Sequence, residues 1–115
     1  MILDDIQSKL EEVDSKVYYG MADKEVQEQI WDFTVFGRST LKVSPNRTGY
    51  SDYYDVTIFR ENFIPEGIDR DVIEKMLEID GMRLANADGS FEYLAKPKTN
   101  AVVEALTLHF VRARK

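Results

Sequence analysis

YYDVTIFRE, residues 53–61, is the strongest β-strand pattern in this chain of 115 residues. Tyr54, Val56 and Ile58 occupy every second position, so in an extended chain their side chains lie on one face. Aromatic and β-branched residues, which favour strands, fill most of the stretch. It therefore predicts a half-buried strand, whose opposite face carries Tyr53, Asp55, Thr57, Phe59 and Glu61.

The flanking sequence predicts three further strands. Trp31–Phe36 alternates between apolar and polar residues, and Gly37 is expected to end or bulge this strand. A short strand is expected at Val17–Gly20, where β-prone residues are closed by a glycine. Residues 101–112 predict a long closing strand with two distinct faces. One face is apolar except for Glu104 and carries Val102, Glu104, Leu106, Leu108 and Phe110. The other face carries Val103, Ala105, Thr107, His109 and Val111.

Two amphipathic helices are expected. In residues 2–15, apolar side chains recur every three or four positions and form one stripe. A turn at residues 63–67 leads into the second helix, for which Asp69 is the expected N-cap and Gly81 the expected stop. Residues 23–29 are polar and fit neither kind of element.

The segment after the second helix predicts a hairpin. Residues 82–85 and 91–94 are β-prone and flank Asn86–Ser90, a turn-like run in which Gly89 is expected at positive φ. The whole chain, residues 1–115, is therefore expected to be a single α+β domain. It should contain a mainly antiparallel sheet, two helices packed on one face, and this hairpin.

Between the two central strands lies RSTLKVSPNRTGYSD, residues 38–52. Ser, Thr, Pro, Asn and Gly dominate it, which predicts a long loop or the extended tip of a hairpin. A loop of this length is uncommon in a small domain and is often functional.

The composition excludes several classes of protein. The chain has no cysteine, so disulfides and thiolate metal sites are excluded. Its net charge of -6 argues against a general nucleic-acid binder, which needs an excess of Lys and Arg. No apolar run approaches the roughly 18 residues that span a bilayer, and the acidic N-terminus lacks the features of a signal peptide. We therefore expect cytoplasmic synthesis and assembly, without a membrane.

Charge is also unevenly spread along the chain. Residues 1–32 are rich in Asp and Glu, whereas the C-terminus carries Arg112, Arg114 and Lys115. This polarity suits head-to-tail contact between copies, and it equally suits two solvated ends.

Few residues suit catalytic or metal chemistry. His109 is the only histidine, and it lies in the apolar closing strand without a second histidine or a cysteine to share a metal. Asn86–Gly89 resembles part of a calcium loop but lacks the other acidic ligands. Strand aromatics have acidic neighbours, which favours a core or protein interface over a nucleic-acid platform. We expect no catalytic residue, no metal and no cofactor.

The order of these elements resembles that of siphophage tail terminator proteins, also called tail-completion proteins. That family opens with an amphipathic helix and a short aromatic-glycine strand, here Val17–Gly20. Two long strands joined by an extended loop come next, here Trp31–Phe36 and Tyr53–Glu61. A helix, a variable segment and a closing strand complete the pattern, here ending at Ala105–Phe110. The hairpin expected at residues 82–94 departs from it.

The resemblance implies a structural virion protein of a long-tailed phage. Such a protein forms a ring, expected to be a hexamer, that caps the tail tube, ends its polymerisation and joins the tail to the head connector. Its partners would be further copies of itself, the tail tube protein and the connector or stopper, with DNA passing through the ring without sequence recognition. It would assemble in the host cytoplasm and end at the head-proximal end of the tail.

The resemblance also points to candidate contact residues. A closed ring needs two different patches that meet around the circle, and exposed sheet edges can supply them by pairing strands between copies. The long loop is the candidate to reach the tube or a neighbouring ring, through Arg38, Lys42, Arg47, Tyr50 and Asp52. The candidates for the ring interface are Tyr18, Tyr19, Arg112 and Arg114.

Three alternatives stay open at this point. The first is a head-side stopper or another connector subunit, which binding to filled heads instead of tail tubes would identify. The second is a cellular adaptor or regulatory module unrelated to phage, which the neighbouring genes would reveal. The third is an enzyme of unknown type, for which a buried carboxylate pair with shifted pKa values would be the sign.

Overall fold

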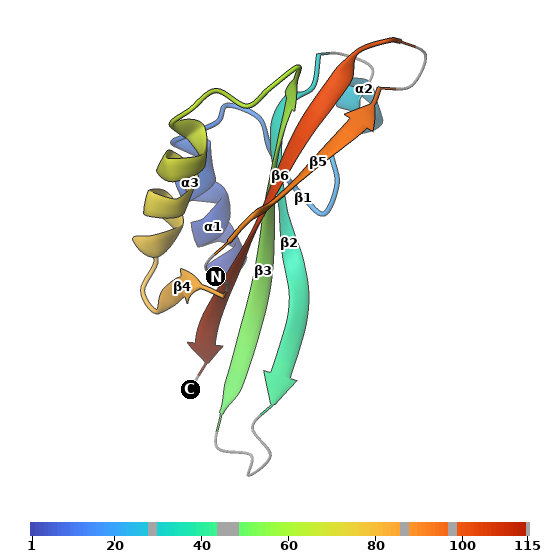
Figure 1. Ribbon diagram of the computed structural model, residues 1–115. Coiled ribbons are helices and arrows are strands. Elements are labelled where there is room, and N and C mark those ends of the chain that lie inside the picture. The colour runs from blue at the N-terminus through green and yellow to red at the C-terminus, as the bar shows by residue number, and fades with distance from the viewer. Residues whose placement is uncertain (28–29, 44–48, 86–87, 97–98, 115) are drawn as a thin grey trace.

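A twisted six-stranded sheet forms the centre of the molecule, and helices cover one of its faces (Figure 1). The computed structural model describes residues 1–27, 30–43, 49–85, 88–96 and 99–114. The strands lie in the order β1-β2-β3-β6, and β4 and β5 both pair with β6 on its outer side. Their bounds are Val17–Tyr19 (β1), Asp32–Val43 (β2), Tyr50–Glu61 (β3), Met82–Leu84 (β4), Ser90–Ala95 (β5) and Val102–Arg114 (β6).

All strand pairs are antiparallel except β1 and β2, which run parallel. The strand predicted most strongly from sequence, β3, is the central one: Ile58 lies between Thr34 of β2 and Leu106 of β6. Tyr54, Val56 and Ile58 are buried while the residues between them are only partly buried, which explains why the alternation of β3 is so clear in the sequence. The predicted α+β class with a mainly antiparallel sheet is confirmed.

Helices α1 (Ile2–Glu11) and α3 (Ile68–Leu77) lie next to each other on the same face of the sheet, as predicted (Figure 1). A short helix, α2 (Lys24–Gln27), occupies part of the segment that fitted no predicted element. The first helix is shorter than the predicted range 2–15. Beyond Glu11 the chain turns, which carries the side chain of Asp14 to the sheet.

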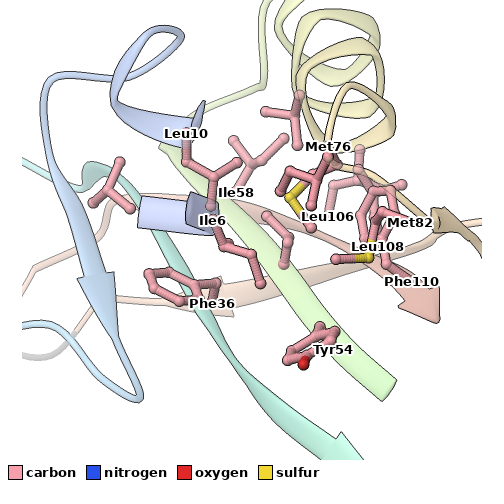
Figure 2. Packing of buried hydrophobic residues seen from close by; sticks show 14 residues of the cluster. Ile6, Leu10, Phe36, Tyr54, Ile58, Met76, Met82, Leu106, Leu108 and Phe110 are labelled. Atoms are coloured by element: carbon pink, nitrogen blue, oxygen red, sulfur yellow. The ribbon is translucent and has the colours of Figure 1, made fainter. Parts of the chain in front are cut away.

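The hydrophobic core fills the space between α1, α3 and the sheet (Figure 2). Alternate side chains of β3 and β6 point into it, as their sequence periodicity predicts. Glu104, the polar exception on this face of β6, is half-buried and its Oε1 accepts the backbone N–H of Ile64 at 2.8 Å. The buried cluster comprises Ile6, Leu10, Val17, Phe36, Tyr54, Val56, Ile58, Val72, Met76, Ile79, Met82, Leu106, Leu108 and Phe110.

A buried ion pair ties the end of α1 to the sheet. Asp14 Oδ2 accepts from Arg60 Nη2 at 2.9 Å and from the Thr34 hydroxyl at 2.8 Å. Arg60 also donates through Nη1 to the carbonyl of Phe59 at 2.8 Å. Only 5% of the Asp14 side chain is exposed, so its charge needs these partners.

The ends of α3 differ in part from the prediction. The N-cap is Gly67, at φ 107°, and not Asp69. Asp69 lies inside the first turn, where its Oδ1 accepts the N–H groups of Gly67 and Arg70 at 3.2 and 2.9 Å. A carboxylate there satisfies helix-start donors without occupying the cap position. Gly81, at φ 81°, follows the helix end as predicted.

The hairpin predicted at residues 82–94 is wrong. β4 and β5 do not pair with each other; both pair with β6, one after the other along the same edge. Leu84 lies opposite Phe110 and Ser90 opposite Thr107, so the registers of β4 and β5 on β6 differ by three residues. With 13 residues, β6 is a longer partner than either short segment could be for the other.

Gly89 is needed for a different reason from the predicted one. Among the residues that the structure describes, positive φ values belong to Gly20, Gly67, Gly81 and Asn62, and not to Gly89. A Cβ at this position would instead lie 2.9 Å from Leu108 Cδ2 and 3.0 Å from Leu106 Cδ1. Gly89 therefore permits the chain to pass close over the core side chains of β6.

Candidate interaction surface

The β2–β3 hairpin extends past the helices and makes the molecule elongated, with principal extents of 51, 26 and 25 Å (Figure 1). Pairing between the two arms is regular up to Arg38 opposite Tyr54, then slips by one residue and resumes with Thr40 opposite Tyr53. Such a bulge raises the local twist and lets the arms curve away from the helices. Gly37 therefore does not end the strand; the irregularity lies just beyond it.

Of the two alternatives predicted for residues 38–52, the long loop is wrong at both ends, whereas the extended end of a hairpin agrees with the pairing of β2 and β3. β2 continues to Val43 and β3 begins at Tyr50. Arg38 and Lys42 therefore lie on β2, Tyr50 and Asp52 lie on β3, and Arg47 lies outside the described residues. Polar residues are tolerated in these arms because β2 is exposed on both faces from Arg38 to Val43. Sequence periodicity gives no strand signal where neither face is buried.

Three of the predicted contact residues meet in one pocket. Arg38, Asp52 and Arg112 line a hollow of about 370 Å³ between the hairpin arms and the first residues of the chain, Met1 and Ile2. Asp52 and Arg112 are directly opposite each other across β3 and β6. Arg112 Nε also donates to the Asp80 carbonyl at 3.0 Å, which holds its side chain over the turn after α3.

The other predicted hairpin residues lie outside this pocket. Lys42 lies over the ring of Tyr53, with Nζ 5.0 Å from the ring centroid, a cation–π contact. Tyr50 is 45% exposed and pairs through its backbone with Val43 on one side and Arg114 on the other.

The four predicted ring-interface residues do not form one surface. Tyr18 and Tyr19 lie on β1, at one side of the sheet, whereas Arg112 and Arg114 lie on β6, beyond β2 and β3. The two tyrosines also face opposite ways: Tyr18 contacts Phe33 edge-on and Tyr19 contacts Phe36. Tyr19 is 51% exposed, so it remains available at the β1 edge.

Two features were missed from sequence. One is the exposure of β5: a strand was predicted at residues 91–94, but all six residues of β5 are exposed, although Phe91 and Tyr93 are aromatic. The other is an apolar groove of about 350 Å³ on the sheet face away from the helices, bounded by Trp31, Phe33 and Phe59. Alternation of Trp31, Phe33 and Val35 pointed to an apolar face, but the sequence does not show that the two helices cover the opposite one.

Charged side chains near the sheet ends are paired. Lys96 Nζ donates to Glu61 Oε1 at 2.8 Å, and this bond, aided by the Trp31 N–H, lowers the pKa of Glu61. The Tyr93 hydroxyl bonds the Glu104 carboxylate, which raises the pKa of Tyr93. Glu104 thus joins β5 and the residue 64 turn to β6.

The lone histidine takes part in a polar ladder on the open face. His109 Nδ1 and Asp55 Oδ1 are 2.6 Å apart across β3 and β6, with about a third of each side chain exposed. The adjacent cross-strand pair is Thr57 and Thr107, whose hydroxyls are 3.1 Å apart. Within the described segments, His, Cys, Asp and Glu side chains do not gather in threes that would hold a metal ion.

No model of a known protein family matches this chain, and a search of curated proteins found no match. None of the helices in the described part of the chain has the length and apolar character needed to cross a bilayer.

Proposed function

We propose that this chain is a non-catalytic structural subunit of a long-tailed bacteriophage, which forms a ring on the head-proximal end of the tail tube. The ring ends tube polymerisation and joins the tail to the head connector. The observation that carries the proposal is the long β2–β3 hairpin projecting from a helix-backed sheet. The order α1, β1, β2–β3, α3 and β6 also follows the element order of the tail terminator family.

The surface of the hairpin supports a role in contact between proteins. Its arms leave Leu41, Val43 and Tyr50 about half exposed, at 53%, 50% and 45%. Apolar and aromatic side chains concentrated on a projecting element are typical of protein interfaces. The nearby pocket adds charges of both signs, through Arg38, Arg112 and Asp52, which suits a specific and oriented contact.

The buried polar groups support a structural role. Asp14 bonds Arg60 and Thr34 to fix the end of α1, and Glu104 bonds the N–H of Ile64 and the hydroxyl of Tyr93. Each of these groups is used to hold segments of the chain together. With a net charge of -6, the ring would let DNA pass without binding it tightly.

The partners follow from this assignment. The ring would contain several copies of this chain, with six expected from the family, and would meet the tail tube protein on one side and the connector on the other. Assembly would take place in the host cytoplasm, and the finished ring would remain in the virion.

Electron microscopy of the purified protein mixed with tail tubes tests the proposal. We expect rings of uniform diameter that cap one end of each tube and stop its growth. Tail tubes assembled from purified tube protein supply the partner. Binding to filled heads in place of tubes would identify a stopper, and binding to neither would refute a role in tail joining.

A further inference from the structure

Two long stretches of sheet edge lack a strand neighbour in the described part of the chain. β1 pairs only with Thr34–Phe36, so β2 is unpaired on its outer side from Gly37 to Val43. At the other side of the sheet, β5 pairs only with β6. Open edges of this kind present backbone N–H and C=O groups to any strand that can approach.

The apolar side chains on these two edges lie on the same face of the sheet. Leu41 pairs with Asp52 and Val43 with Tyr50. Asp52 and Tyr50 lie two and four positions from the core residue Tyr54 on β3, so these pairs point to the helix side of the sheet. Phe91 pairs with Leu106 and Tyr93 with Glu104, also on the helix side. All four are exposed, by 53% for Leu41, 50% for Val43, 54% for Phe91 and 64% for Tyr93.

The charges on the opposite face are complementary. Lys42 pairs with Ser51 and lies over Tyr53, which places it on the open face. Glu92 pairs with Ala105 and points to the same open face. Beside the first edge, Arg38 adds positive charge on the helix side, where it pairs with Tyr54, and Asp88 adds negative charge just before the second edge.

We propose that β2 of one copy pairs antiparallel with β5 of the next copy, with Lys42 opposite Glu92. This register, which rests on the proposed ring, places Leu41 opposite Tyr93 and Val43 opposite Phe91. The direction follows from the sheet: β2, β3, β6 and β5 alternate, so successive copies of the same orientation bring β5 and β2 together antiparallel. The contact is heterologous, as a closed ring requires.

The register also fixes how the copies are displaced. Val43 is level with Tyr50 and Arg114, whereas Phe91 is level with Leu106, eight residues earlier on β6. At ~3.3 Å per residue, neighbouring copies are staggered by about 26 Å along the strands. A ring closes with such a stagger only if the strands are inclined to its axis, as they are in barrels.

Disulfide trapping tests the register directly, because the natural chain contains no cysteine. Directly opposite Cα atoms in antiparallel strands are close enough for a disulfide. We expect the double variant Leu41→Cys with Tyr93→Cys to form a ladder of linked chains on mild oxidation. Leu77→Cys with Tyr93→Cys is the matched control, because Leu77 is also exposed but lies on α3, and it should yield no ladder.

Charge reversal tests the contact without a covalent bond. Lys42→Glu and Glu92→Lys should each weaken self-association about tenfold, because like charges then lie opposite each other. The double variant should recover association, as measured by sedimentation velocity. Arg70→Glu and Glu74→Lys are the controls, because both residues are exposed and lie on α3, which belongs to neither strand edge.

The outcomes separate this inference from the proposed function. Rings on tube ends without the ladder, or without charge recovery, overturn the β2–β5 joint and leave the tail role standing. A protein that stays monomeric at every concentration, with and without tubes, overturns both. A ladder without capping of tubes supports the joint and refutes the tail role.

Discussion

Asp14 shows how one residue can decide where a helix ends. Apolar periodicity continues past Glu11, and yet α1 stops there, because the buried carboxylate of Asp14 accepts from Arg60 and Thr34 on the sheet. These bonds require the chain to turn toward β2 and β3. A side chain 46 residues away thus overrides local helix propensity, which is why the predicted boundary was too late.

Asp14→Ala should lower the free energy of unfolding by about 3 kcal/mol, because it leaves a buried guanidinium and a buried hydroxyl without their carboxylate. Denaturant unfolding measures the change. Asp23→Ala is the control, since Asp23 is exposed, and it should change stability by less than about 0.5 kcal/mol. Equal effects of the two substitutions would contradict the role given to the buried pair.

Gly89→Ala should destabilise the protein by about 1–3 kcal/mol, because the new methyl group meets the side chains of Leu106 and Leu108 and the backbone of Thr107. Gly37→Ala provides the comparison: nothing lies within 4 Å of a Cβ there and its φ is not positive. That variant should be neutral or slightly stabilised. Thermal melts of both variants check the contrast, which would vanish if Gly89 were merely a flexible linker.

At the scale of elements, the chain divides into strands that are held by the core and arms that are not. The inner half of β3 and most of β6 contribute buried residues, whereas β2 beyond Gly37 contributes none. The inner parts of these strands therefore stabilise the fold, whereas the outer parts are available for contact with other proteins.

Leu106→Asp should prevent folding, because Leu106 is 3% exposed at the centre of the core and a buried unpaired carboxylate is very costly. Val102→Asp on the same strand should fold, since Val102 is 47% exposed. Circular dichroism and size-exclusion chromatography distinguish the two. Soluble, monodisperse Leu106→Asp protein would show that β6 is not where the structure places it.

Replacing residues 39–53 with Asn-Gly should leave the core folded while removing the outer arms of the hairpin. Arg38 and Tyr54 face each other across the strands, so a two-residue turn can close there. We expect a cooperative melt and complete loss of tube capping in electron micrographs. A shortened protein that still caps tubes would show that the hairpin is not the joining element.

For the molecule as a whole, stability should be greatest between weakly acidic and moderately alkaline pH. The folded pKa values of Glu61 and Glu78 are lowered, first of all by Lys96 and Lys9, from 4.5, so their contribution is present above that value and is lost as pH falls further. The folded pKa values of Lys16 and Lys75 are raised from 10.5, first of all by Asp32 and Glu12, so their contribution is lost as pH rises past it.

Melting temperatures from pH 2 to pH 12 should therefore form a plateau with a fall on each side. Added salt should flatten the alkaline fall, because the lysine pairs are partly exposed and screened. Lys96→Met should reduce the part of the acid fall that belongs to Glu61. If the drop in melting temperature at acid pH is unchanged in that variant, Glu61 does not contribute as stated.

Sequence patterns predicted the parts of this molecule that are buried on one face. The alternating residues Tyr54, Val56 and Ile58 predicted β3, and the apolar stripe predicted α1 equally clearly, because burial of one face makes apolar residues recur at regular intervals. The arms from Arg38 to Val43 gave no such signal, and the pairing of β4 and β5 with β6 depends on competition between distant segments. The pocket that joins Arg38, Asp52 and Arg112 follows from strand register, which side-chain spacing alone does not encode.

The change of register between β4 and β5 on β6 helps to protect the sheet edge against unintended strand pairing. Because the registers of β4 and β5 on β6 differ by three residues, these two strands do not form one continuous outer edge of the sheet. A misfolded chain that adds to this margin can pair in one continuous register with the six residues of β5, but not with β4 and β5 together. The interruption thus limits how far an unintended strand can extend along this side of the sheet, while β5 stays available to the proposed neighbouring copy.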